Sequence, residues 1–531
     1  MGATSVVNSI SIIKQPSDEK EEIKKYFLFG VFFDGTGNDM TNNHHVLADS
    51  QRPSVNLNNK KKTEEVCKVP LSPQLNNKKR LKKYEQYKEE NFKLDDFYSN
   101  KDGDDANDYS NVALLHHCFQ GMSDDEISTL LAKNYDVHIY NIYIEGPGTT
   151  GSIDKLIGSG FGRGSGGVLA LLSQAANRIV AKLSEFGDLS NAEFHFDVFG
   201  FSRGATLARM FSTTVLDDDC PRVLLNNDTK ELRDKVKRTA AFVDFLGLFD
   251  TVSSIGIGVN DVEKYGLYLH DNVLRAMHLC ASDEFRKNFA VTDLGDSVNR
   301  DFISEFYIPG CHTDVGGTYK TNIRTLKIEY MRDLPRPVIM DLDPFMPVCM
   351  EDLGLLKAPL KMFAHEPNSR NGEKDISVEL LSNLGWFSMT KSNMVTDNGY
   401  IYEAQRLVQE GYNLLPFTLI KERANKERTV FRSFQSGYSR FDMNKNVETL
   451  TADIKEKIGK TMKGRHFVYP QGSYISSNYR ELRENYINYS ASPFHLVNMP
   501  SFFGETMCRI VVDGNKKSRG DFFMCDYQTR D

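Results

Sequence analysis

Runs of consecutive apolar residues alternate with segments whose apolar positions follow helical spacing over the first three fifths of the chain. Such runs are typical of buried strands, and glycine-containing loops follow them. They predict strands over Tyr26–Phe33, Val137–Ile144, Phe194–Phe199, Ala241–Phe249 and Phe302–Ile308. The intervening segments predict helices over Val112–Phe119, Val168–Phe186, Ala205–Val215 and Asn272–Phe289. This alternation predicts an α/β core over residues 25–320, with a mostly parallel sheet flanked by helices.

Three regions fall outside this alternation. Residues 1–24 form an N-terminal segment, and residues 41–107 are rich in Asn, Lys, Asp and Glu, which predicts a polar insertion in the core. Its basic cluster over Lys78–Lys83 fits a solvated helix face better than a contact with anionic lipid. After residue 320, prolines interrupt the apolar groups, so residues 321–531 are predicted to form an appended cap or membrane-contact region.

Composition and charge exclude several classes of protein. The formal charge of −7, from 65 basic and 72 acidic residues, argues against a nucleic-acid partner. Eight dispersed cysteines without a C-x-x-C pair indicate neither a zinc site nor a dense disulfide framework, and favour synthesis in the cytoplasm. The sequence begins without the pattern of a signal peptide and contains no run of 18 apolar residues, so any membrane contact is expected to be peripheral.

One serine stands where a predicted strand meets a predicted helix. Gly200-Phe201-Ser202-Arg203-Gly204 follows the apolar run FHFDVF and precedes a helical pattern. This context is typical of a nucleophile elbow, in which glycines remove the Cβ atoms that would clash at a sharp turn. The alternative is an ordinary tight turn between a strand and a helix. The elbow predicts Ser202 as a catalytic nucleophile.

The partners of such a serine are expected downstream, in the order acid and then histidine. Asp250 ends the apolar run AFVDFLGLF and is the candidate acid, whereas Asp244 lies inside the run and is a weaker choice. His312 opens the glycine-containing loop CHTDVGG after a predicted strand, which makes it the candidate base. His270 and His278 are weaker candidates, because His278 lies in the predicted helix and His270 precedes it.

An oxyanion hole requires backbone donors near the nucleophile. The N–H of Arg203 is the first expected donor, and the turn FFDGTGN offers Gly35 or Thr36 as the second. The same turn resembles a phosphatase motif, but Phe32 replaces the aspartate that would become phosphorylated. The glycine-rich run GSGFGRGSGG lacks the context of a nucleotide-binding loop.

A metal site remains an alternative to the serine mechanism. Its ligands would be Asp34, Asp39, His312 and Asp314, although no familiar metal-ligand spacing supports such a site.

FFDGTGN, GFSRGA, LGLFDTVSS and PGCHTDVGG occur in the order of the α/β-hydrolase family that includes type VI secretion phospholipase effectors, and the chain resembles that family over residues 25–320. The resemblance implies an α/β-hydrolase fold, a triad of Ser202, Asp250 and His312, and metal-free phospholipase A activity. It also implies delivery by a type VI secretion system into the periplasm of a neighbouring bacterium. The implied partners are membrane phospholipid, a secretion spike protein and an immunity protein.

Two other functions stay open, namely a soluble carboxylesterase and a non-catalytic interaction module on a hydrolase fold. The sequence does not distinguish cleavage at sn-1 from cleavage at sn-2. Trp386 and Phe387 are the candidate membrane contacts, because large aromatic side chains suit the boundary between water and lipid. The alternative is that both are core residues of the appended region.

Overall fold

The structure is a computed structural model of the chain. It describes residues 7–12, 23–38, 109–148, 167–236, 241–254, 262–317, 322–331, 338–341, 388–392, 399–408, 411–432, 443, 445–468, 478, 481–482, 485–488, 501–503, 506–507, 509–517 and 520–524.

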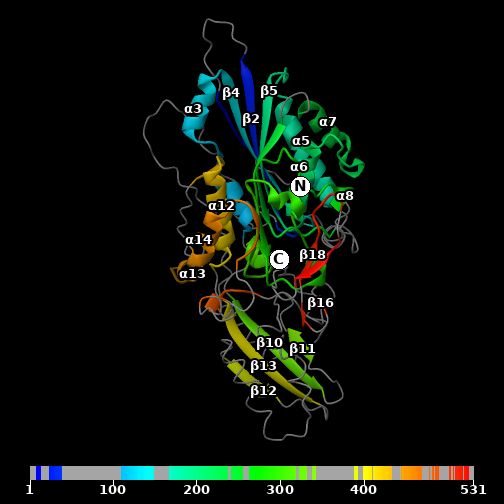
Figure 1. The fold of residues 1–531 in the computed structure, drawn as a ribbon, viewed down its shortest axis with the longest axis vertical. Coiled ribbons are helices and arrows are strands. Elements are labelled where there is room, and N and C mark those ends of the chain that lie inside the picture. Colours follow the sequence, from blue (N-terminus) through cyan, green and yellow to red (C-terminus); the bar gives the residue numbers. More distant parts are fainter. Residues whose placement is uncertain are drawn as a thin grey trace, which may run out of the picture.

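A twisted sheet forms the centre of the described part of the chain (Figure 1). Its eight strands lie in the order β1-β4-β2-β5-β6-β7-β9-β15, and only the pairing of β1 with β4 is antiparallel. The strands are β1 (Val7–Ile12), β4 (Tyr135–Ile144), β2 (Lys24–Phe33), β5 (Ala192–Phe201), β6 (Ala241–Phe249), β7 (Ala276–Ala281), β9 (Ile303–Ile308) and β15 (Gly464–Phe467). The predicted mostly parallel α/β sheet, of the α/β-hydrolase-like class, is therefore confirmed.

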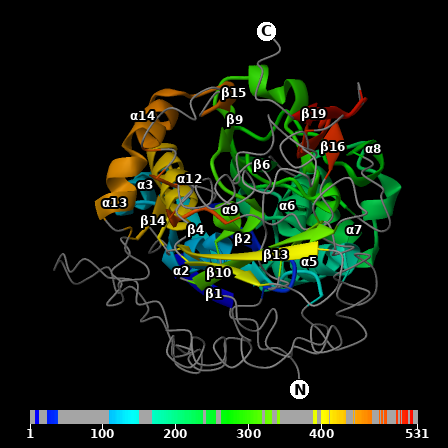
Figure 2. The same ribbon diagram turned by 90° about the horizontal axis from the view of Figure 1, so that it is seen from below.

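Helices cover both faces of this sheet, and Figure 2 shows them on opposite sides of the strands. One face packs against α5 (Val168–Leu183), α6 (Arg203–Leu216) and α7 (Asn227–Val236). The other packs against α2 (Asn111–Cys118), α3 (Asp124–Ala132), α12 (Leu414–Lys426), α13 (Lys445–Leu450) and α14 (Ala452–Lys460). Because both faces are buried, the central strands consist of almost continuous apolar residues.

Phenylalanine pairs between β2 and β5 contribute to both layers of the core. The register places Phe29 opposite Phe196, and Phe32 opposite Phe199. The ring centroids of these pairs lie 5.6 Å and 5.0 Å apart. Since alternate residues of a strand face opposite ways, the first pair packs below α5 and α6 and the second packs toward α2 and α12. The strongly apolar sequence around the predicted elbow thus serves to fix two neighbouring strands.

The helix predicted over Asn272–Phe289 is wrong. Its centre is the fully buried strand β7, and only the 3₁₀ turn Lys287–Phe289 is helical. The six residues AMHLCA lie between β6 and β9 with both faces covered, so no alternation of polar and apolar positions distinguishes them from a buried helix. His278 consequently lies in the sheet.

The core is not complete at residue 320, where the sequence predicted its boundary. Strand β15 adds to the edge of the sheet beside β9, and α12 packs on the face that also holds α2. Strand β14 (Val430–Phe431) pairs with β3 (Phe119–Gly121). Strand β18 (Arg509–Val512) lies between β8 (Val291–Thr292) and β19 (Phe522–Met524). Segments from beyond residue 400 therefore belong to the same core as the predicted hydrolase region.

Other described segments after residue 320 form small sheets of their own. At the lower end of Figure 1, a four-stranded antiparallel sheet has the order β11-β10-β13-β12. Its strands are β10 (Asn322–Met331), β11 (Val338–Asp341), β12 (Ser388–Ser392) and β13 (Gly399–Val408). Strands β16 (Phe502–Phe503) and β17 (Thr506–Met507) form a two-stranded pair.

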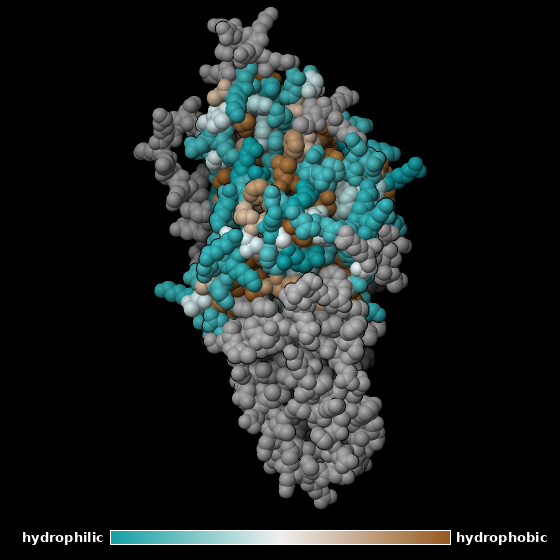
Figure 3. All heavy atoms as spheres, viewed as in Figure 1, coloured by the Kyte–Doolittle hydropathy of each residue, from teal (hydrophilic) through white to brown (hydrophobic). Residues whose placement is uncertain are grey.

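The described surface in Figure 3 is largely hydrophilic, with apolar residues in small separate areas. Within the described residues, no helix combines the length and the apolar character required to cross a lipid bilayer.

Candidate active site

Ser202 lies in the turn that joins β5 to α6. Its backbone has φ 59° and ψ −126°, a conformation that residues with side chains rarely adopt. The Ser202 N–H donates to Phe249 O at 3.0 Å, and Val252 N–H donates to Ser202 O at 3.2 Å. These bonds fix the turn against the end of β6, which is the arrangement expected for a nucleophile elbow.

The two glycines of this turn permit close approach of the backbone. A Cβ on Gly200 would lie 2.4 Å from Gly204 O, and a Cβ on Gly204 would lie 2.3 Å from both Phe33 O and Asp34 O. Helix α6 can therefore rest on the end of β2 only while residue 204 has no side chain. This geometry explains physically why glycines flank Ser202.

Asp250 and His312 come together beside this turn. Strand β6 ends at Phe249, which is paired with Phe201, so Ser202 and Asp250 leave neighbouring strands at the same level. His312 begins the short helix α9 (His312–Gly316), which follows β9. Its Nδ1 lies 2.6 Å from Asp250 Oδ2, and both side chains are buried. The carboxylate thereby favours the tautomer that leaves His312 Nε2 able to accept a proton.

The pKa values of this pair depend on burial and on neighbouring charges. Burial lowers the pKa of His312 below its ordinary value, although the hydrogen bond to Asp250 acts in the opposite direction. Burial alone would raise the pKa of Asp250, but Arg509 and His312 together hold it well below its usual range. A neutral imidazole next to an ionised carboxylate is the protonation state that a general base requires.

The ring of Phe201, the residue before Ser202, packs against His312 and against the backbone at Gly35 and Gly316. Its centroid lies 4.7 Å from that of His312. A Cβ added to Gly35 would lie 2.4 Å from the Phe201 ring, and a Cβ added to Gly316 would lie 2.0 Å from it. The backbone at both glycines therefore packs directly against this ring. Within the described residues, no hydrogen bond joins Ser202 Oγ to His312, and such bonds often form only when substrate binds.

The candidate oxyanion donors are not equivalent. Gly35 N–H donates to Asp34 Oδ1 at 2.6 Å, whereas Thr36 N–H has no acceptor among the described residues. The Thr36 hydroxyl accepts a hydrogen bond from Arg203 Nε at 2.7 Å, which ties this turn to the start of α6. The backbone N–H of Arg203 lies at the positive end of that helix. The geometry thus favours Thr36 over Gly35 as the second donor.

The loop that carries His312 is held by residues from far along the chain. Asp314 accepts hydrogen bonds from Cys311 N at 3.0 Å, from Asn488 N at 2.8 Å and from Asn488 Nδ2 at 2.6 Å. Burial raises the pKa of Asp314 to about 6. The Tyr412 hydroxyl donates to Pro309 O at 2.5 Å, just before the loop. These anchors restrict the positions available to the imidazole of His312.

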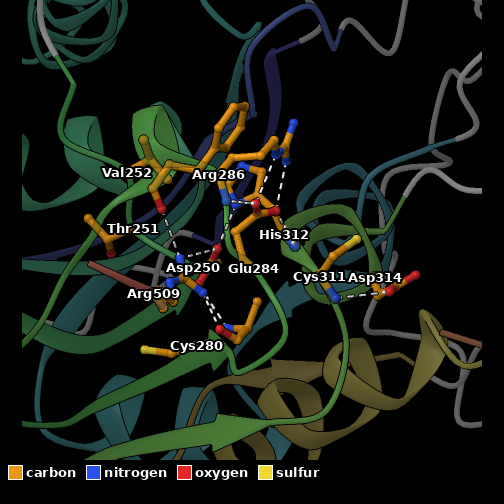
Figure 4. Close-up of polar contacts among 12 residues, drawn as sticks. Asp250, Thr251, Val252, Cys280, Glu284, Arg286, Cys311, His312, Asp314 and Arg509 are labelled. Atoms are coloured by element: carbon orange, nitrogen blue, oxygen red, sulfur yellow. Dashed lines mark hydrogen bonds and ion pairs between the residues drawn. The ribbon is translucent and has the colours of Figure 1, made fainter. Parts of the chain in front are cut away.

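Sequence reasoning missed the charged groups around the pair, which Figure 4 shows converging on it. Arg509 Nη2 donates to Asp250 Oδ2 at 2.8 Å, and His312 N–H donates to Glu284 Oε2 at 3.2 Å. Arg286 Nη2 bonds to Glu284 Oε2 at 2.8 Å. Glu284 and Arg286 fell in the wrongly predicted helix, and no local pattern distinguishes Arg509 from a surface arginine.

Two of the four ligands of the alternative metal site, Asp34 and Asp314, are engaged in hydrogen bonds with protein groups. Asp34 binds Gly35 N and the Tyr143 hydroxyl, and Asp314 binds the groups given above. The one group of three candidate ligands found among the described residues is His278, Cys280 and Glu305. His278 Nε2 there accepts from Thr251 N at 3.1 Å, and its Nδ1 lies 3.0 Å from Glu305 Oε2. Since both ring nitrogens are engaged, this group is better explained as a hydrogen-bonded network of the core.

Several candidate residues, including the basic cluster Lys78–Lys83, have no described position. Asp39, Trp386 and Phe387 lie outside the described residues, so the membrane-contact role of the two aromatic residues stays a prediction.

Comparison with known proteins gives a family context to one part of the chain. The family model described as "T6SS, Phospholipase effector Tle1-like, catalytic domain" matches residues 217–336. No curated protein matches the sequence significantly. A solved structure of the Tle1 effector bound to the VgrG spike from the type 6 secretion system is 18% identical, with 92% of this chain and 91% of that chain covered and a TM-score of 0.49.

A second structure, an uncharacterized protein from Pseudomonas aeruginosa, is 16% identical, with 56% of this chain and 42% of that chain covered and a TM-score of 0.27. Sequence identities this low do not transfer an activity from one protein to another. By the family model, residues 217–336, which contain Asp250 and His312, are similar to the catalytic domain of type VI secretion phospholipase effectors.

Proposed function

We propose that this protein is a serine-dependent phospholipase of the A type, delivered to neighbouring bacteria as an antibacterial type VI effector. The observation that carries the proposal is the buried Asp250–His312 pair beside the Ser202 turn, at the carboxyl ends of neighbouring parallel strands. This edge is where α/β sheets place their ligands. The match of residues 217–336 to a phospholipase effector family supports lipid as the substrate class.

In the proposed reaction, Ser202 Oγ attacks the carbonyl carbon of an acyl ester while His312 Nε2 takes the hydroxyl proton. The negative charge that forms on the carbonyl oxygen is stabilised by the N–H groups of Arg203 and Thr36. Collapse of this intermediate releases the lysolipid alcohol, which receives the proton from His312, and leaves the acyl group on Ser202. Water then attacks the acyl-enzyme with His312 again as the base, which releases the fatty acid and restores the serine.

The biological setting is also a proposal. Export through the type VI machinery would place the enzyme in the periplasm of the target cell, where membrane phospholipid is accessible. A secretion spike protein and an immunity protein are the expected partners, and Trp386 with Phe387 is the proposed membrane contact.

Hydrolysis of defined phospholipid vesicles by variants of the triad tests this function. Ser202→Ala, Asp250→Asn and His312→Ala are each expected to lower the turnover by about 10³-fold or more, without additive losses, because the three groups act as a unit. A fluorophosphonate probe should label the wild type but not Ser202→Ala. The matched control is Ser212→Ala, which removes a buried hydroxyl of the same helix that bonds only to Ala208 O among the described residues.

The outcomes separate the competing functions. Equal activity on short soluble esters with no gain on vesicles would indicate a carboxylesterase. No hydrolysis of any ester and no labelling would indicate a non-catalytic module. Mass spectrometry of the products from lipids with distinguishable acyl chains identifies the position that is cleaved.

A further inference from the structure

The triad acid is in contact with a buried guanidinium from a distant part of the sequence. Arg509 is 1% exposed and begins strand β18. Its Nη2 donates to Asp250 Oδ2 at 2.8 Å and to Phe289 O at 3.2 Å, and its Nη1 donates to Ala281 O. Figure 4 shows this side chain reaching the carboxylate that also contacts His312.

The carboxylate of Asp250 has donors on both oxygens. Oδ1 accepts a hydrogen bond from Ala281 N at 2.8 Å, and Oδ2 accepts from both Arg509 and His312. A buried carboxylate with only a neutral imidazole beside it would tend to take up a proton or to protonate the imidazole. The guanidinium removes this tendency because it supplies a permanent positive charge and a donor of fixed geometry.

The charged groups that face His312 come from several elements and balance one another. Asp250 follows β6, whereas Glu284 and Arg286 follow β7. Arg286 forms an ion pair with Glu284, and its Cζ lies 3.3 Å from the centroid of the Phe289 ring. The Phe289 and His312 rings pack edge to face, with their centroids 5.0 Å apart. His278 contacts the turn that follows Asp250, because its Nε2 accepts a hydrogen bond from Thr251 N. The two carboxylates are thus matched by two guanidinium groups, Arg286 and Arg509.

We propose that Arg509 is a positioning residue of the active site, which keeps Asp250 ionised and oriented and offsets its attraction for a proton on His312. This inference rests on the proposed function. Arg509 touches neither the substrate nor the reacting atoms, and it acts through Asp250. Burial lowers the pKa of His312, and the positive charge that Arg509 places on the far side of Asp250 acts in the same direction, which favours a neutral imidazole able to accept the proton of Ser202.

The sign of the effect follows from the charges. Arg509→Gln leaves two carboxylates and a single guanidinium around the imidazole, so the protonated form of His312 becomes more favourable and its pKa rises. Because the base must be neutral, the acidic limb of the pH profile of kcat/KM is expected to move toward higher pH by about one unit or more. Arg509→Lys retains the charge but not the planar donor pair, so its acidic limb should stay near that of the wild type while kcat falls.

The experiment measures kcat/KM for a soluble short-chain ester, and the rate of fluorophosphonate labelling of Ser202, as functions of pH in the full chain. Arg423→Gln is the matched control, because Arg423 is a buried arginine that donates to Ile458 O and Thr461 O away from the site. That variant should lose stability without a shift of the acidic limb. An unshifted limb in folded Arg509→Gln, or an equal shift in Arg423→Gln, would overturn the proposal.

A second variant keeps the proposal testable if Arg509→Gln does not fold. Glu284→Gln removes one of the two negative charges, so it should move the acidic limb toward lower pH, in the opposite direction. A shift toward higher pH, or none, would contradict the charge balance. Absence of Ser202-dependent labelling in the wild type would instead refute the proposed function itself, so the two failures are distinguishable.

Discussion

Two residues of the candidate site hold a backbone conformation that is unfavourable for side-chain-bearing residues. Ser202 has φ 59° and Asp250 has φ 46°. Such conformations cost about 1–3 kcal/mol each and persist only where the surroundings enforce them. Here Ser202 is hydrogen-bonded to Phe249 and Val252, which lie on either side of Asp250, and Asp250 N–H donates to Leu279 O. The strain therefore points to a site in which the positions of these side chains matter more than local stability.

Thr36 offers a test at the level of a single hydroxyl. Thr36→Val keeps the volume but removes the acceptor of Arg203 Nε, a buried donor, which should destabilise the fold by about 1–3 kcal/mol. Because the same bond holds the turn that carries the proposed second oxyanion donor, turnover should fall by about tenfold to 10²-fold. Denaturant unfolding and ester hydrolysis measure the two effects. Thr36→Ser should retain both properties, and wild-type turnover in Thr36→Val would show that the turn does not depend on this bond.

At the scale of elements, the junction between β5 and α6 depends on close backbone contact. Gly204→Ala would place a Cβ 2.3 Å from Phe33 O and Asp34 O, and backbone atoms cannot move aside as a flexible side chain would. The free energy of unfolding should fall by about 1–3 kcal/mol or more, as measured by denaturant titration. The control is Gly459→Ala in α14, where an added Cβ meets nothing within 4 Å. That variant should be as stable as the wild type or more stable. Equal stability of both variants would refute the packing argument.

The success of sequence reasoning varied with the element. The strands β2, β4, β5 and β6 were predictable because each is a long apolar run that ends in a glycine-containing or polar loop. Strand β7 was mistaken for a helix because a short strand buried on both faces has no alternating pattern. Strand β15 has the sequence GRHF, which contains no apolar run. It pairs with β9 in parallel, and its Arg465 Nε bonds to Glu305 of β9 at 2.5 Å.

The same distinction applies to the candidate site. Ser202, Asp250 and His312 could be proposed from the sequence because each follows a predicted strand, in the order typical of α/β-hydrolases. Arg509 and Asn488 could not, because their roles arise from contacts 259 and 174 residues away along the chain. No local property of a sequence records such a contact.

At the scale of the whole molecule, Arg465 bonds β15, a strand from beyond residue 400, to Glu305 in the central sheet. It also bonds to Asp293 Oδ2 at 2.6 Å. Burial would raise the pKa of Glu305, but Arg465 and His278 lower it to about 2. Arg465→Met removes this compensation from a fully buried carboxylate, so the free energy of unfolding should fall by about 3–5 kcal/mol near pH 7.

The pH dependence of this loss follows from the same lowered pKa. Stability from Glu305 is present above its unfolded pKa, near 4.3, and disappears as the pH falls toward 2. The difference between the wild type and Arg465→Met should therefore shrink over that interval in urea titrations. Adding Glu305→Gln should recover part of the loss at pH 7, and failure of that rescue would show that the ion pair is not the cause.

The long separation between Asp250 and Arg509 also sets an order of events during synthesis. Ribosomes deliver the chain from its amino end, so the serine, the acid and the histidine emerge well before the arginine that contacts the acid. Parallel sheets with such distant contacts fold slowly. Until β18 docks, the nascent chain holds a carboxylate and an imidazole without their compensating cation, and the imidazole is poorly set to accept a proton. The proposed active site would therefore be complete only once β18 has been synthesised and has docked beside Asp250.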